Sequence, residues 1–385
     1  MCPAQVTNTF NCLSFISVGA RYHCRGIDTE GNVANFVETE QIIFTSEGRC
    51  ASFLQIRGSI PFFWRQNVHI KYKPELEIVK DAPSEKAFRK HRDNLLKRYG
   101  RVAIANLVDS RGGEAQLSAI FKELSELDFE QFSDSWKYVE FDFHLQCRNM
   151  AYQNIDKLVK QLESELSSYG YFEVSNGKII KKQSGVVRTN CMDCLDRTNV
   201  VQSVLARHTL LQQLKDFEIL SKEASHEDFG EVLIGIFRNV WADNADAIST
   251  QYSGTGALKT DFTRTGKRTP FGALQDGINS VLRYYFGNFS DGTRQDSLDL
   301  LFGAYKVDPT NYISPFQNVK TDPIRNLVTS TLFYSILLFF FFAHFNDMKF
   351  SFKGMLISAL MIILLLQFIR MNGKRFVQKP RLIKN

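Results

Sequence analysis

The sequence predicts a mixed α/β domain with a strand–loop–helix unit, followed by a C-terminal pair of membrane-spanning helices. Three observations lead to this prediction. Strand-like and helix-like apolar patterns alternate over residues 53–214. A β-branched run at 185–190 is joined to a helical pattern at 198–214 by a loop rich in Cys, Asp and Arg. Two uncharged apolar runs lie near the C-terminus, at 327–345 and 354–369.

The strands are predicted from apolar runs and from alternation. Residues 53–64 read as a strand with a bend at Gly58 and Pro61. Residues 101–109 form an apolar run typical of a buried strand, and residues 138–145 alternate between apolar and polar.

The helices are predicted from apolar residues at helical spacing. Residues 114–127 show this spacing, and so do residues 154–170, where Gly170 marks the end. In the third helix, 198–214, Val200, Val201, Val204, Leu205 and Leu211 share the pattern. The polar loop before this third helix therefore leads directly into a helix N-terminus.

Composition bounds the class of protein. The chain has 385 residues with 44% hydrophobic and 23% charged content, which is typical of a globular protein. Seven cysteines, an odd number in a long chain, favour a reducing compartment. The formal charge of +6 arises from six basic residues and no acid in 370–385; the remainder carries 41 Lys and Arg (47 less 6) against 41 Asp and Glu. A neutral body argues against nucleic acid as a partner.

The two apolar runs predict a membrane hairpin. Each is long enough, or nearly so, to cross a bilayer, and neither has a polar face; the alternative is two buried core helices. The short connection leaves both ends on one side, and the basic tail places that side in the cytosol. The first 20 residues end in small residues, as a signal peptide does at its cleavage site. They lack the basic residues with which a signal peptide begins. With the body in the cytosol, the sequon at Asn288 stays unglycosylated.

The loop "RTNCMDCLDRTN", 188–199, contains the main chemical signal. Cys191 and Arg197 have the C-x5-R spacing of a loop that holds a phosphate over a nucleophilic sulfur; the alternative is a plain polar loop. A helix N-terminus and a guanidinium lower a thiol pKa, and a thiolate can attack phosphorus. Arg197 can bind two phosphate oxygens, and Thr198 can donate a hydrogen bond to the sulfur. The strand–P-loop–helix order therefore predicts a Cys-based phosphatase-like catalytic domain.

Two aspartates within the loop are candidates for the general acid. A thiolate and a phosphate nearby would raise the pKa of Asp193 or Asp196, and a protonated carboxyl could protonate the leaving group. Alternatively, either residue caps the helix or holds Arg197. Cys194 forms a C-x-x-C pair with Cys191, but the chain has no second pair at ligand spacing, so neither a metal nor a cofactor is predicted.

A glycine-rich basic segment, 251–270, is the second candidate for substrate contact. It is either a solvated surface turn or a loop that meets a phosphorylated head group or an anionic lipid surface. Its basic residues are Lys259, Arg264, Lys267 and Arg268.

The loop resembles the signature of the Sac-domain phosphoinositide phosphatases. The blocks "RGSIPFFW", "FDFH", "WADNADAISTQYSGTGALKTDFTRTGKRT" and "DGINSVLRYYFGNFSDGTRQDSLDLLFG" are similar to family blocks in family order. The resemblance implies Cys191 as nucleophile, Arg197 as phosphate ligand, and phosphatidylinositol monophosphates, chiefly the 4-phosphate, as substrates. We add Asn190 and Thr198 to the substrate-binding residues. The apolar segments resemble those of the family member of the endoplasmic reticulum and Golgi membranes, which implies that location.

The expected organisation follows from these features. A divergent N-terminus, 1–20, precedes a Sac-type domain, 21–320, whose N-terminal lobe is largely missing compared with the family; the two membrane helices and a basic cytosolic tail, 370–385, follow. The tail lacks a clean dilysine signal. Two alternative functions stay open: a catalytically silent adaptor that binds phosphoinositides, and a membrane-tethered phosphoprotein phosphatase. The sequence does not identify protein partners.

Overall fold

The computed structural model describes most of the chain in two compact units. The described residues are 4–13, 19–72, 74–148, 151–303, 316, 322–344 and 348–382. The first unit comprises Met1–Arg65 with Leu76–Arg283, and the second comprises Gln66–Glu75 with Tyr284–Asn385. Residue 345, the predicted end of the first membrane span, and Lys384 of the basic tail lie outside the described residues.

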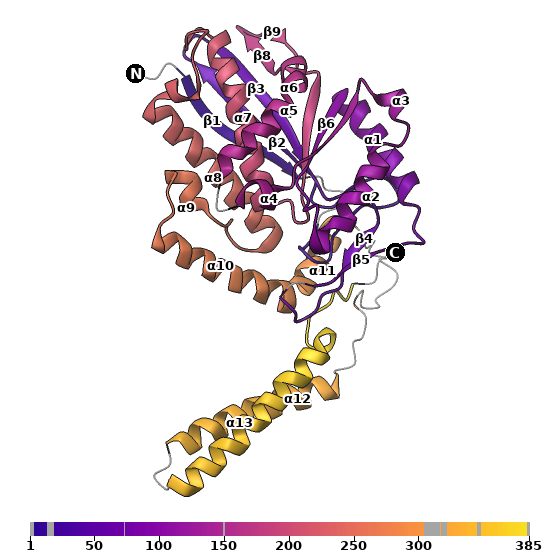
Figure 1. Ribbon diagram of the computed structural model, residues 1–385, viewed down its shortest axis with the longest axis vertical. Coiled ribbons are helices and arrows are strands. Elements are labelled where there is room, and N and C mark those ends of the chain that lie inside the picture. Colours follow the sequence, from indigo (N-terminus) through magenta and orange to yellow (C-terminus); the bar gives the residue numbers. More distant parts are fainter. Residues whose placement is uncertain are drawn as a thin grey trace, which may run out of the picture. The chain divides into compact units, whose positions relative to one another are not determined.

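The first unit is built on an eight-stranded mixed sheet (Figure 1). The strand order is β1-β2-β3-β10-β6-β7, with β8 pairing β3 and β9 pairing β8; β4 and β5 form a separate two-stranded sheet. The strands are β1 (Ala4–Leu13), β2 (Val37–Thr45), β3 (Arg49–Arg57), β4 (Trp64–Gln66), β5 (Leu76–Ile78), β6 (Arg101–Asn106), β7 (Trp136–Glu140), β8 (Phe172–Ser175), β9 (Lys178–Lys181) and β10 (Gly185–Asn190).

The centre of the sheet is parallel. β10 pairs with β3 on one side and β6 on the other, and β7 extends the parallel set beyond β6. Asn190, at the end of β10, is in register with Asn106 at the end of β6. The carboxyl ends of these strands therefore meet at one edge, where ligands bind in open α/β sheets.

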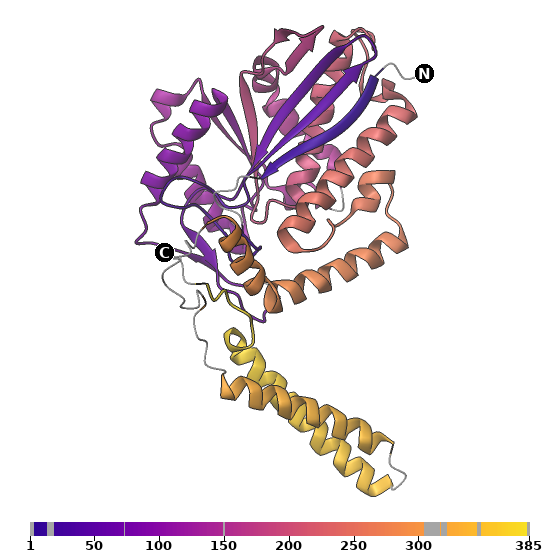
Figure 2. The same cartoon turned by 180° about the vertical axis from the view of Figure 1, so that it is seen from behind.

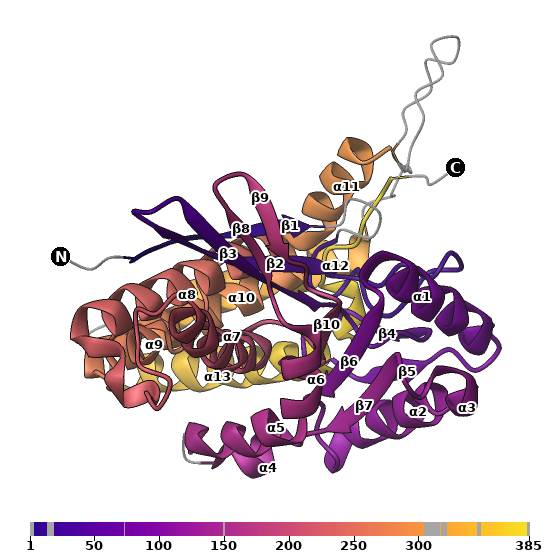
Figure 3. The ribbon, with the colours of Figure 1, turned by 90° about the horizontal axis from the view of Figure 1, so that it is seen from above.

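Helices cover both faces of this sheet (Figures 1 and 3). Alternation along β10 separates the faces: Val186 packs into a core with Phe88 of α1 and Phe121 of α2, whereas Val187 packs into the core of α5, α7 and α8. The helices of the described residues are α1 (Ser84–Tyr99), α2 (Ala115–Ser125), α3 (Phe129–Phe132), α4 (Phe143–Gln146), α5 (Ile155–Gln161), α6 (Glu163–Tyr169), α7 (Asp196–Asp216), α8 (Gly230–Ser253), α9 (Thr260–Thr265), α10 (Pro270–Phe289), α11 (Asp291–Leu301), α12 (Pro323–Ala343) and α13 (Met348–Met371).

Three predicted elements are wrong in part. The strand predicted at 138–145 ends at Glu140, because Asp142 caps the short helix α4 by accepting from the Leu145 backbone N–H. The helix predicted at 154–170 is broken at Leu162 into α5 and α6. The strand predicted at 53–64 ends at Arg57, before the bend at Gly58 and Pro61.

The second unit contains α12 and α13, both long and apolar enough to cross a membrane (Figure 2). Only 11% and 17% of their most apolar windows are buried, which is less than expected for core helices of a soluble domain. The two helices approach closely where the Phe342 ring lies against Gly354, since a Cβ at Gly354 would come within 2.5 Å of that ring. Small residues permit such close helix packing in membranes.

Candidate active site

The Cys191 loop, residues 191–195, lies at the carboxyl edge of the parallel strands. It leaves β10 after Asn190 and enters α7 at Asp196, so Arg197 is the second residue of that helix. Cys194 has a φ of +52°, a left-handed conformation that is uncommon for residues other than glycine. This turn directs the Cys194 backbone N–H at the Cys191 Sγ atom, 3.0 Å away.

Cys191 is buried and is surrounded by groups that favour its thiolate. The Thr198 Oγ1 donates to the Cys191 Sγ at 3.4 Å. Burial alone would raise the pKa of Cys191, but hydrogen bonding from Cys194, the charge of Arg197 and the Thr198 hydroxyl together lower it to about 6. The neighbouring thiol behaves in the opposite way: burial and the nearby Cys191 sulfur raise the pKa of Cys194 well above its usual range. The surroundings therefore favour the thiolate form of Cys191 and the thiol form of Cys194.

Arg197 is held by two carboxylates that the sequence analysis did not single out. Its Nη1 lies 3.0 Å from Glu114 Oε2 and its Nη2 lies 3.2 Å from Glu114 Oε1, a bidentate pair. Asp109 Oδ1 lies 3.2 Å from the same Nη1. Although burial would lower it, the pKa of Arg197 is raised by Cys191, Glu114 and Asp109. Arg197 therefore keeps its positive charge, and both of its terminal nitrogens contact Glu114 in this structure.

Asp193 does not have the raised pKa expected of a general acid. Its Oδ2 accepts from Arg21 at 2.7 Å, and its Oδ1 accepts from the buried Arg25. Burial would raise the pKa of Asp193, but these two guanidinium groups hold it far below its usual range. The prediction of a raised carboxyl pKa is wrong for Asp193, because arginines about 170 residues upstream keep it ionised.

Asp196 forms hydrogen bonds that fix the start of α7. Its Oδ2 accepts from Arg283 at 3.0 Å, and its Oδ1 accepts from the Leu258 backbone N–H at 2.9 Å. Arg283 also donates to Ser249 and to the Gly256 carbonyl. Asp196 thus ties the Cys191 loop to α10 and to the segment after α8. Among the described contacts, neither loop aspartate holds Arg197.

Asn190 lies beneath the loop and not on its open side. Its Nδ2 donates to Asn106 Oδ1 at 2.7 Å, and its Oδ1 accepts from Arg188 at 3.3 Å. The side chain is fully buried, as are those of Cys191 and Thr198, and contact between Asn190 and substrate stays a prediction. In this structure Asn190 links the ends of β10 and β6.

The basic segment 251–270 is largely neutralised by acidic neighbours. Arg264 pairs with Asp243 at 2.7 Å and Asp246 at 3.2 Å. Arg268 pairs with Asp276 at 2.6 Å and with Asp261. Arg264 and Arg268 are therefore already paired with carboxylates, and their contact with a head group stays a prediction.

The two lysines of that segment are placed differently. Lys259 lies in the left-handed region at the start of α9, and its Nζ is 3.5 Å from the Tyr152 hydroxyl. Lys267 is exposed. Only these two cations of the predicted set are left without a carboxylate partner among the described residues.

A second group of polar side chains lies beside Arg197, after the parallel strands β6 and β7. His144 Nδ1 lies 2.7 Å from Asp109 Oδ1, and Ser110 donates to Asp142. The sequence analysis placed Asp109 at the end of a predicted strand, which is the signal that could have found it. Within the described residues, no group of three or more Cys, His, Asp or Glu is placed to hold a metal ion.

Known proteins support the resemblance. Residues 13–148 match the SacI homology domain. The chain is 43% identical to the zebrafish phosphatidylinositol-3-phosphatase SAC1-A over 96% of its own length and 63% of that protein. It is 43% identical to fruit-fly phosphatidylinositol-3-phosphatase SAC1 over 94% of the chain and 62% of that protein. The corresponding values for yeast phosphatidylinositol-3-phosphatase SAC1 are 40%, 96% and 61%.

The chain thus spans a little over three fifths of the length of these curated relatives. The matched region covers nearly all of the chain, including the Cys191 loop, β10 and α7. The sequence resemblance, the match of residues 13–148 to the SacI homology domain and the identity to several relatives agree: the chain is similar to phosphatidylinositol phosphatases over nearly all of its own length.

Proposed function

We propose that this chain hydrolyses phosphatidylinositol monophosphates through a phosphocysteine intermediate. The observation that carries the proposal is the environment of Cys191: a buried sulfur that accepts from the Cys194 backbone N–H at a helix start, with its pKa lowered to about 6. The names of the relatives, phosphatidylinositol-3-phosphatase, support the same substrate class.

The reaction follows from the residues at the site. The Cys191 thiolate attacks the phosphorus, forming a P–S bond while the P–O bond to inositol breaks. The inositol oxygen leaves with the electron pair of that bond and is protonated. Water then cleaves the P–S bond and releases inorganic phosphate, and Thr198 donates to the departing sulfur. Arg197 binds two phosphate oxygens, for which it must first release Glu114.

The membrane location is part of the proposal. We infer that α12 and α13 cross the membrane as a hairpin, with the SacI homology domain and the basic residues after Arg370 on the cytosolic side. We infer that the membrane is that of the endoplasmic reticulum and Golgi, as the sequence resemblance implies. An anionic lipid surface there would attract the basic tail.

The test is phosphate release by the full chain on three substrates. We expect turnover of phosphatidylinositol 4-phosphate and phosphatidylinositol 3-phosphate in mixed vesicles, and none of a phosphopeptide. The 4-phosphate is the isomer that the sequence resemblance favours, whereas the printed names of the relatives specify the 3-phosphate. Cys191→Ser should abolish turnover and retain binding to the vesicles. Binding without turnover by the unmodified chain would instead identify a silent adaptor.

A further inference from the structure

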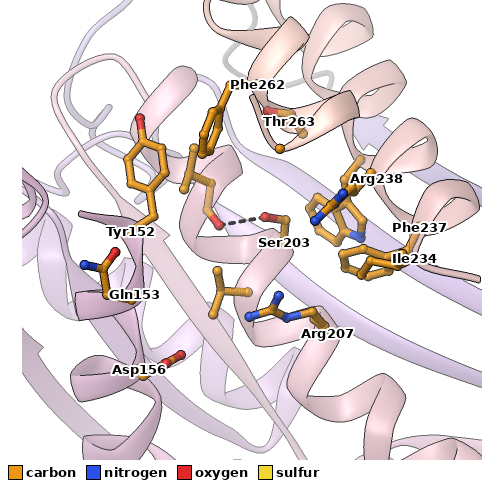
Figure 4. Close-up of a pocket in the computed structure, with 14 residues that line it drawn as sticks. Tyr152, Gln153, Asp156, Ser203, Arg207, Ile234, Phe237, Arg238, Phe262 and Thr263 are labelled. Atoms are coloured by element: carbon orange, nitrogen blue, oxygen red, sulfur yellow. Dashed lines mark hydrogen bonds between the residues drawn. The ribbon is translucent and has the colours of Figure 1, made fainter. Parts of the chain in front are cut away.

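A cavity on the α7–α8 side of the sheet is separate from the Cys191 loop. It has a volume of about 370 Å³ and lies among α5, α7, α8 and α9 (Figure 4). No residue of 190–198 contributes to its wall, which is formed by described residues only. The volume falls within the range of small-molecule pockets, roughly 300–1,000 Å³.

Most of the wall is apolar. Val200 and Val204 of α7, Ile234 and Trp241 of α8 and Phe262 of α9 line it. Phe262 is fixed edge-on against Tyr152, with ring centroids 5.4 Å apart. Such a wall favours a ligand with a compact apolar body.

Two guanidinium groups enter the cavity, from Arg207 of α7 and Arg238 of α8 (Figure 4). Neither forms an ion pair or hydrogen bond with any residue that the structure describes, and the buried Nε of Arg207 has no hydrogen-bond partner there. The contrast with Arg264 and Arg268, which are both paired, is clear. Unpaired, partly desolvated guanidinium groups are costly unless an anion joins them.

Asp156 is the acidic residue in the wall of the cavity. It attracts Arg207 electrostatically but forms no ion pair with it among the described contacts, and Arg238 repels Arg207. Burial, the largest effect, and Arg238 lower the pKa of Arg207, while Asp156 opposes them. One acid against two arginines leaves the cavity with a net positive charge. An incoming anion would relieve the repulsion between Arg207 and Arg238.

We propose that this cavity binds a small amphiphile in which a phosphate or phosphonate group is joined to an apolar body. The anionic group lies between Arg207 and Arg238, and the apolar body lies against Val204, Trp241 and Phe262. The source of such a ligand is either a lipid monomer or a soluble organic phosphate. The proposal does not depend on catalysis at Cys191, because none of the residues of the Cys191 loop takes part.

Isothermal titration of the full chain in phosphatidylcholine nanodiscs tests the proposal. The probe is hexylphosphonate, which a phosphatase does not hydrolyse. Inorganic phosphate and hexanol are the control ligands, and they represent its anionic half and its apolar half. We expect one saturable site for hexylphosphonate and at least tenfold weaker binding of either half. Adding short-chain phosphatidic acid should displace the probe if the site accepts lipid monomers, and phenyl phosphate should displace it if it accepts soluble organic phosphates.

Substitutions of the two cavity arginines test whether the probe binds in this cavity. Arg207→Gln and Arg238→Gln should each weaken hexylphosphonate binding at least tenfold. Arg238→Gln is the variant less able to disturb folding, because the Nε of Arg207 is buried without a hydrogen-bond partner and that of Arg238 is not. Arg98→Gln, an exposed arginine on α1, is the matched control and should bind like the parent. Binding that survives in both cavity variants but disappears in Arg197→Gln belongs to the catalytic loop and overturns the proposal, as does the absence of any saturable binding.

Discussion

The thiol of Cys191 should titrate near pH 6, and removing the charge of Arg197 should move that titration upward. The ordinary thiol pKa is 9.0, and in the folded chain it is lowered to about 6. This difference of about three units corresponds to roughly 4 kcal/mol in favour of the thiolate. Arg197→Gln removes one of the main contributions, so we expect the pKa to rise by about one unit or more. At pH 7 the thiolate fraction would fall from about nine tenths toward one half or less.

The assay is the rate of alkylation of Cys191 by iodoacetamide between pH 4.5 and 10, followed by mass spectrometry of the peptide that contains it. No substrate is present, because a phosphate monoester itself titrates near pH 6 and would mask the thiol. Burial of Cys191 slows the reaction at every pH but leaves its midpoint unchanged. Cys147, whose pKa burial raises to about 11, is the internal control for a thiol that stays protonated.

The sign of the effect on stability follows from the same shift. An acid whose pKa is lower in the folded chain stabilises folding above its unfolded pKa, and this contribution is lost as the pH falls through about 6. Urea midpoints should therefore decrease from pH 9 to pH 6 by more in the parent than in Cys191→Ser. A Cys191 alkylation midpoint near 8.5, or one that Arg197→Gln does not move, would refute the reasoning.

Three further substitutions separate the roles of neighbouring residues. Arg197→Lys should reduce turnover at least a hundredfold, because the bidentate fork is lost while the charge remains; phosphate release measures this. Asp193→Asn leaves the buried Arg25 without its carboxylate and should destabilise the chain by about 3 kcal/mol, read from urea unfolding; an unchanged stability would count against the pairing. Cys194→Ser should retain most turnover, since its backbone N–H still reaches the sulfur, but should make Cys191 easier to over-oxidise by peroxide.

Local patterns predicted the elements that position the site. The strand at 185–190 and the helix that follows were expected from β-branched residues and helical spacing, and the structure has β10 and α7 there. The apolar runs at 327–345 and 354–369 correspond to α12 and α13. Such features are decided by neighbouring residues, so a single sequence contains enough information. The role of the loop as a phosphate site stays a prediction.

Charge partners could not be predicted, because they are brought together by the fold. The pKa of Asp193 depends on Arg21 and Arg25, which lie in a segment before β2. In the same way, the basic residues of 251–270 looked free in the sequence, yet Arg264 meets Asp243 and Asp246 from α8. A charge without its tertiary partner gives the wrong sign of a pKa shift, as the prediction for Asp193 shows.

The bidentate ion pair between Glu114 and Arg197 has the largest consequence for the proposed reaction. Arg197 makes four contacts with oxygens of Leu107, Asp109 and Glu114, and two of these form the bidentate geometry that a phosphate would need. A phosphate group would therefore compete with Glu114 for the two terminal nitrogens of Arg197. The phosphate dianion can displace the Glu114 carboxylate there only if its other oxygens also accept hydrogen bonds. In the proposed reaction the Cys191 loop would have to supply the donors for these hydrogen bonds. The proposed reaction therefore requires that phosphate binding and the release of Glu114 from Arg197 be coupled.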